Sequence, residues 1–118
     1  MSNGRVLRRR GRETVVFSVR TWPDGDAVLV VVVSGEIDLA TAPQLSQELL
    51  SQIDTGWRYV TVDLSEVTFI DSTGIAALVA EKRRVKDVGG SMTLRHPQPL
   101  VRRALQIAAM DRLFTIED

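Results

Sequence analysis

The sequence of 118 residues contains no cysteine and only one histidine, His96. The lack of cysteine excludes disulfide scaffolds, thiol catalysis and cysteine-based metal sites. A single histidine argues against a zinc hydrolase and against a Ser-His-Asp triad. His96 directly precedes Pro97 and is interpreted as an ordinary loop residue. We therefore expect no metal and no cofactor.

Long apolar segments are also missing. The longest unbroken apolar run is Ala27 to Val33, and a helix needs about 20 such residues to cross a bilayer. The arginines near the N-terminus are not followed by an apolar stretch, so they do not form a secretory signal. We expect a cytoplasmic protein with no membrane partner.

Acidic residues are absent from residues 1–12, which carry a charge of +5 from five arginines, whereas residues 13–118 carry −5. We predict a disordered basic arm over 1–12 and one domain over 13–118. The charge of the domain argues against direct binding of nucleic acid. Three interpretations of the arm stay open, namely a solvated tail, a contact with RNA or DNA phosphates, and a contact with an acidic partner surface.

The remainder of the chain alternates between two hydrophobic periodicities. Runs rich in β-branched residues predict strands, and apolar residues three or four positions apart predict helices. We expect strands near 15–20, 27–34, 58–63, 91–95 and 113–116, helices near 42–53, 72–88 and 97–109, and a connection over 64–71. Strand-helix-strand units of this kind predict an α/β fold with largely parallel pairing.

No common catalytic signature is present. The sequence contains no glycine-rich phosphate loop and no nucleophile elbow. A small nucleotide-using enzyme stays an alternative, because loops at strand ends are able to contact a nucleotide. Micromolar nucleotide binding in a calorimetric titration would favour it.

The most informative segment is Asp71-Ser72-Thr73-Gly74, which follows apolar Phe69-Ile70 and opens a helix. The simplest interpretation is a helix N-cap, because Asp, Ser and Thr oxygens accept the free N–H groups of the first turn. An exposed Ser72 hydroxyl is also suited to phosphorylation, since a helix N-terminus tolerates added negative charge. The phosphate would repel an acidic or apolar partner without unfolding the domain.

A second segment, residues 34–42, connects the strand near 27–34 to the next helix. If its strand neighbours the one before Ser72, both loops lie at the carboxyl edge of the sheet, where α/β folds place binding sites. Asp38, Thr41, Asp71 and Ser72 would then share one surface. Glu36 and Asp38 are equally well explained as solvated loop acids with a helix cap.

Taken together, these segments resemble the STAS domain, in particular the stand-alone bacterial anti-sigma factor antagonists. The resemblance spans about residues 13–117 and rests on Gly-Glu-Ile-Asp-Leu-Ala-Thr-Ala at 35–42, Val-Asp-Leu-Ser at 62–65, Phe-Ile-Asp-Ser-Thr-Gly-Ile at 69–75 and Gly-Gly at 89–90. It implies a mixed β-sheet with helices packed mainly on one face and a hairpin at the N-terminal edge.

The resemblance also implies a function. The chain would bind an anti-sigma factor that is itself a serine kinase and so free a sigma factor, as in stress response or sporulation. Phosphorylation of Ser72 would end the binding, and a serine phosphatase would restore it. The partner-binding residues would be Asp38, Thr41, Asp71, Ser72, Thr73 and Gly74. The alternative is an unphosphorylated STAS subunit of a transporter or a larger signalling assembly.

Overall fold

One mixed β-sheet forms the centre of the molecule. The structure is a computed structural model, which describes the backbone of residues 3–10 and 13–118 and the side chains of residues 17–118. Its six strands lie side by side in chain order. The elements are β1 (Asn3–Arg10), β2 (Glu13–Asp24), β3 (Val28–Ile37), α1 (Ala42–Asp54), β4 (Tyr59–Ile70), α2 (Ser72–Asp87), β5 (Ser91–Arg95), α3 (Pro99–Ile107) and β6 (Thr115–Glu117). The first three strands pair antiparallel, and β3 to β6 pair parallel. The predicted α/β class and mixed sheet are therefore confirmed.

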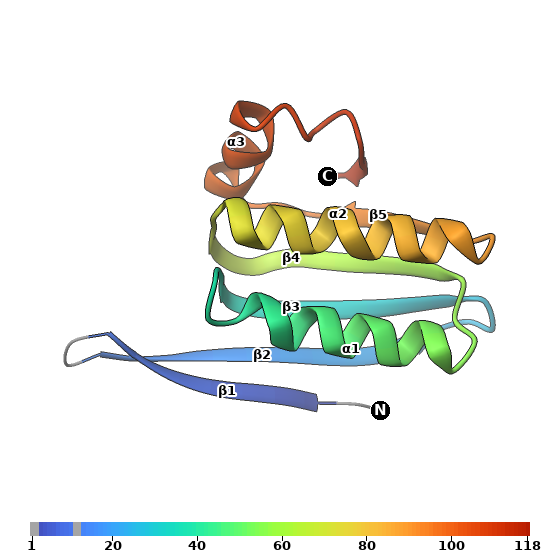
Figure 1. Ribbon diagram of the computed structural model, residues 1–118, viewed down its shortest axis with the longest axis horizontal. Helices are drawn as coiled ribbons and strands as arrows, with labels where there is room; N and C mark the ends of the chain where they lie inside the picture. The colour runs from blue at the N-terminus through green and yellow to red at the C-terminus, as the bar shows by residue number, and fades with distance from the viewer. Residues whose placement is uncertain (1–2, 11–12) are drawn as a thin grey trace.

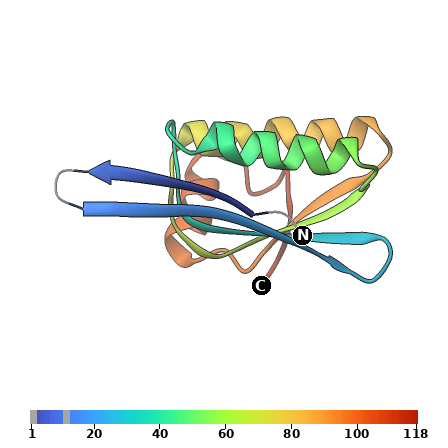
Figure 2. The same ribbon diagram turned by 90° about the horizontal axis from the view of Figure 1, so that it is seen from below.

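Helices α1 and α2 lie next to each other over one face of the sheet, as Figures 1 and 2 show. In α1, Leu45, Leu49 and Ile53 recur every four residues and are buried against the sheet. Burying such a stripe removes apolar surface from water and holds the helix in place. In α2, Leu78 and Val85 are fully buried in the same way. The predicted packing of helices mainly on one face is what the structure has.

Helix α3 lies at the end of the sheet rather than over its centre (Figure 1). Strand β5 pairs with β4 only as far as Asp63 and Arg95, so no other strand of the described residues pairs with the rest of β4 on that side. Helix α3 contacts β4, and the Gln98 amide donates a hydrogen bond of 2.8 Å to the Ser65 carbonyl. This position brings the end of α3 close to the start of α2.

Strands β3 and β4 are longer than the sequence predicts. The segment 64–71, expected to be a connection, continues β4 to Ile70, and β3 runs through Gly35 to Ile37. Two register irregularities, between Val32 and Ser34 and between Gly35 and Glu36, let the parallel pairing continue. Hydrophobic periodicity misses these residues because a bulge interrupts the alternation of faces.

A polar cluster fixes the first irregularity. The Glu66 carboxylate accepts hydrogen bonds from the Ser34 hydroxyl at 2.6 Å and from the Arg20 guanidinium at 2.8 Å, so it joins β2, β3 and β4. These two donors, Ser34 first, hold the pKa of Glu66 below its ordinary value. Because the Glu66 carboxylate is half exposed, the ion pair adds little to the free energy of unfolding. Its main effect is to fix the register of β3 against β4.

The N-terminal segment differs from its prediction as a disordered arm. Asn3–Arg10 forms β1 and pairs antiparallel with β2, with Val6 opposite Phe17. The edge of β2 offers unpaired backbone groups, which a neighbouring segment of extended chain can satisfy. Residues 1–2 and 11–12 of the predicted arm lie outside the described residues.

Candidate functional site

The candidate site lies at the edge where the parallel strands β3 and β4 end. Ile37 and Ile70 are the last paired residues of these two strands. Each is followed at once by an aspartate, Asp38 after β3 and Asp71 after β4. Because parallel strands end at the same edge, the two loops are brought together as predicted. A backbone hydrogen bond of 3.1 Å from the Asp71 N–H to the Ile37 carbonyl ties them directly.

The loop after β3 is held closed by Asp38 and Thr41. The Asp38 carboxylate accepts the Ala40 N–H at 3.0 Å. The Thr41 hydroxyl donates to the Glu36 carbonyl at 2.7 Å and accepts the Asp38 N–H at 2.9 Å. Asp38 is only 7% exposed and Thr41 1%. These two predicted site residues therefore shape the loop, and a partner would meet the outward-facing residues between them.

The loop after β4 begins α2 with a side-chain cap. The Asp71 carboxylate accepts the Gly74 N–H at 2.9 Å, so Asp71 is the N-cap and Ser72 is the first residue of the helix. Gly74 is buried, whereas Ser72 is exposed. Of the polar residues predicted for the site, Ser72 is thus the exposed one. Thr73 is half-buried behind it.

Removing the cap is expected to cost a measurable part of the stability. Asp71→Ala should lower the free energy of unfolding by about 1 kcal/mol, because one N–H of the first turn loses its acceptor. Asp71→Asn keeps a side-chain oxygen at the same place and should stay close to the wild type. Urea titration of the three proteins tests this, and equal loss in both variants would mean that charge, rather than capping, stabilises the helix start.

The two aspartates line one shallow groove. Its volume is about 350 Å³, and its other lining residues are Leu39 and Ala40. Leu39 is 75% exposed although it is apolar, which is unusual for a residue held in a rigid loop. Sequence reasoning included Leu39 in a motif but assigned it no role. Leu39 therefore lies beside the two predicted binding residues Asp38 and Asp71 in the same groove.

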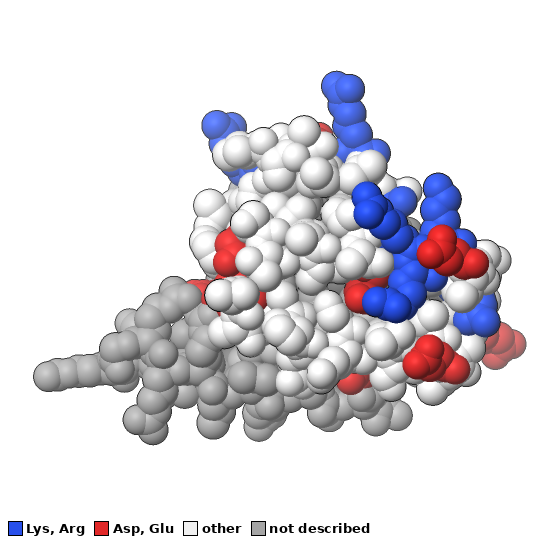
Figure 3. Space-filling view, viewed as in Figure 1, with Lys and Arg blue, Asp and Glu red and all other residues white. Residues whose placement is uncertain are grey.

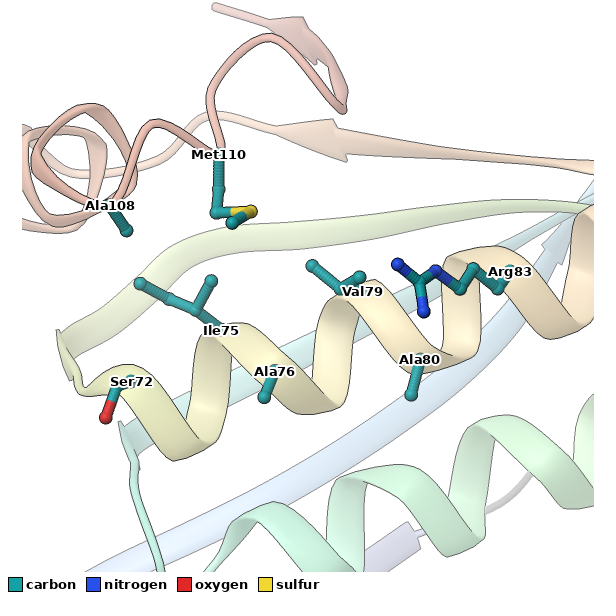
Figure 4. Close-up of a pocket in the computed structure, with 8 residues that line it drawn as sticks. All are labelled: Ser72, Ile75, Ala76, Val79, Ala80, Arg83, Ala108 and Met110. Atoms are coloured by element: carbon teal, nitrogen blue, oxygen red, sulfur yellow. The ribbon is translucent and has the colours of Figure 1, made fainter.

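A second groove starts at Ser72 and follows α2. Its volume is about 370 Å³. Figure 4 shows Ile75 and Val79 of α2 on one side, and Ala108 and Met110, which follow α3, on the other. The sequence does not predict this groove, because it depends on how α3 is placed beside α2. Ser72 lines this groove, and its sequence neighbour Asp71 lines the first one.

Metal-binding clusters and membrane-spanning helices concern the described part of the chain alone. Within it, no group of three or more His, Asp or Glu side chains is arranged to hold a metal ion. None of the helices in that part is long and apolar enough to cross a membrane.

Comparison with known proteins shows the family of this chain. Residues 23–118 match the STAS domain. The anti-sigma-B factor antagonist of Bacillus subtilis (strain 168) is 30% identical over 86 residues, which cover 73% of this chain and 78% of that protein. A crystal structure of an anti-sigma factor antagonist from Mycobacterium paratuberculosis has a TM-score of 0.71 at 28% identity, covering 98% of this chain and 86% of that one.

A third comparison shows similarity of fold only. SpoIIAA, the Bacillus cell fate determinant, in its phosphorylated form has a TM-score of 0.65 at 19% identity and covers 83% of this chain and 89% of that one. The chain belongs to the STAS domain family, and within it to the anti-sigma factor antagonists. Proteins of this group are regulators and not enzymes.

Proposed function

We propose that this chain binds an anti-sigma factor in the cytoplasm and thereby frees a sigma factor for transcription, and that phosphorylation of Ser72 ends the binding. The observation that carries the proposal is the exposed Ser72 at the first position of α2, at the end of the apolar groove and directly after Asp71, which lines the other groove. The anti-sigma factor is itself the serine kinase. A serine phosphatase returns the chain to its binding form.

The chemistry of the switch follows from the position of Ser72. The kinase transfers the γ-phosphoryl group of ATP to the Ser72 oxygen, which loses its proton, and ADP leaves. The helix N-terminus tolerates the new charge, because its free N–H groups and dipole favour an anion there. The fold is therefore expected to remain intact when Ser72 is phosphorylated.

The partner surface, in contrast, changes strongly. A phosphate adds about −1.5 to −2 and takes the charge of residues 13–118 from −5 to about −7. The added charge lies next to Asp71 and beside the apolar groove along α2. A partner docked there would have to bury the phosphate or accept it at close range, and both are unfavourable.

A pull-down with phosphosite mapping tests this proposal. The wild-type chain should capture a protein with a serine-kinase domain, and incubation of the pair with ATP should place one phosphate on Ser72. Ser72→Ala should capture the same protein and take up no phosphate. Copurification with a transporter, with no phosphate on Ser72 in cell extracts, would contradict the proposal and favour a constitutive STAS subunit.

A further inference from the structure

The groove along α2 has a charged group at its far end. Arg83 lines the groove three turns after Ser72. At about 1.5 Å of rise per residue, this separation of eleven positions along the helix spans roughly 16 Å. Figure 4 shows the Arg83 side chain extending along the groove towards Val79. Between Ser72 and Arg83 the lining is apolar, so the groove has Ser72 at one end, the Arg83 side chain at the other and an apolar floor.

Arg83 is the one charged side chain among the described residues that line this groove. Its neighbour Arg84 forms an ion pair of 3.0 Å with the buried Glu81. Among the described residues, Arg83 has no such carboxylate within ion-pair distance. In Figure 3 the surface over the first half of α2 is largely uncharged, and basic side chains, with acidic ones among them, gather over the second half of α2. A partner group that pairs with Arg83 in this groove would therefore carry a negative charge.

The shape of the groove favours a helix as its occupant. Ala76 and Ala80 line the groove one turn apart on α2, on the side of the helix that Figure 4 shows away from Met110. Small side chains at this spacing let a second helix approach closely. Met110 on the other wall is flexible and adapts to different apolar side chains. Three turns of groove match the apolar stripe of an amphipathic helix of about eleven residues.

We propose that the groove between Ser72 and Arg83 receives an amphipathic helix of the anti-sigma factor, with an acidic residue of that helix paired to Arg83. The inference rests on the proposed function, since it names how the same partner is held. It also makes Arg83 the residue that selects partners by charge. Ser72 lies at the opposite end of the same groove, so a phosphate there acts on a helix that Arg83 anchors.

The test measures affinity for the anti-sigma factor recovered in the pull-down, by calorimetric titration at low and high salt. Arg83→Gln should weaken binding by about tenfold and Arg83→Glu by about a hundredfold, since close interfacial charge pairs couple by more than 1.5 kcal/mol. Ala80→Gln should also weaken binding by about tenfold, because the larger side chain occupies the groove. Glutamine has a high helix propensity, so α2 itself should stay intact. Lys86→Gln is the matched control, as it changes an exposed residue of α2 outside the groove, and should stay within twofold.

The outcomes separate the two proposals. Wild-type affinity in both Arg83→Glu and Ala80→Gln would overturn the helix inference, whereas weakening by Ser72→Asp in the same titration would leave the proposed function standing. No binding of the wild-type chain would contradict both. A lipid is the alternative occupant of an apolar groove with a basic end, and dodecanoate is the probe for it. If the chain binds dodecanoate, loses that binding in Arg83→Gln, and keeps its affinity for the anti-sigma factor in the same variant, the helix inference is overturned. Replacing the acidic partner residue with lysine should restore binding to Arg83→Glu.

Discussion

Gly74→Ala is expected to lower the free energy of unfolding by about 2 kcal/mol and the melting temperature by roughly 5–10 °C. Alanine normally stabilises a helix relative to glycine by up to about 1 kcal/mol. Here the new Cβ would lie 2.7 Å from the Ile37 carbonyl oxygen and 2.8 Å from the Ile70 side chain. The carbonyl belongs to the backbone at the end of β3 and accepts the Asp71 N–H, so it has little freedom to move. The steric cost therefore outweighs the gain in helix propensity.

Thermal unfolding of Gly74→Ala beside Ser72→Ala measures this effect. Ser72 is exposed in the same first turn, so its replacement should change stability by less than about 0.5 kcal/mol. If Gly74→Ala were as stable as the wild type, α2 would not press against the end of β3 as closely as described. The loops bearing Asp38 and Asp71 would then not be held in a fixed relation.

Ser72→Asp is expected to weaken binding of the anti-sigma factor at least tenfold, while Ser72→Ala keeps affinity within about threefold of the wild type. Aspartate adds one negative charge at the start of α2, and a like charge or apolar surface on the partner opposes it by 1.4 kcal/mol or more. The two variants fold alike, because both change an exposed side chain and Asp71 still caps the helix. Calorimetric titration of both proteins gives the two affinities.

Equal affinity of Ser72→Ala and Ser72→Asp would contradict a switch based on charge. A loss in both variants would indicate instead that the Ser72 hydroxyl itself bonds to the partner. Circular dichroism of each variant confirms that the comparison is made between folded proteins.

Much of the fold is predictable from the sequence because its signals are local. The repeats of Leu45, Leu49 and Ile53 predict α1, and the valine-rich run before Ser34 predicts a strand buried on both faces. The bulged ends of β3 and β4 are not predictable in this way. Their pairing depends on Glu66, which joins residues far apart in the chain, Arg20 and Ser34.

The site shows the same division. The pattern around Ser72 predicts the start of a helix, and the structure places the cap on Asp71 and leaves Ser72 exposed. The burial of Thr41 and Gly74 is not visible in the sequence, since it arises from contacts with Glu36 and Ile37. The groove to Arg83 needs α3 to lie beside α2, and neither helix encodes that arrangement alone.

The central claim, that phosphate on Ser72 controls binding, is tested most directly by one titration. The chain is phosphorylated at Ser72 by its partner kinase, purified, and titrated against the anti-sigma factor beside the unmodified chain. A phosphate carries more charge than aspartate, so the loss of affinity should exceed that of Ser72→Asp and reach about a hundredfold, with full recovery after phosphatase treatment. Equal affinities of the phosphorylated and unmodified chains would contradict the account.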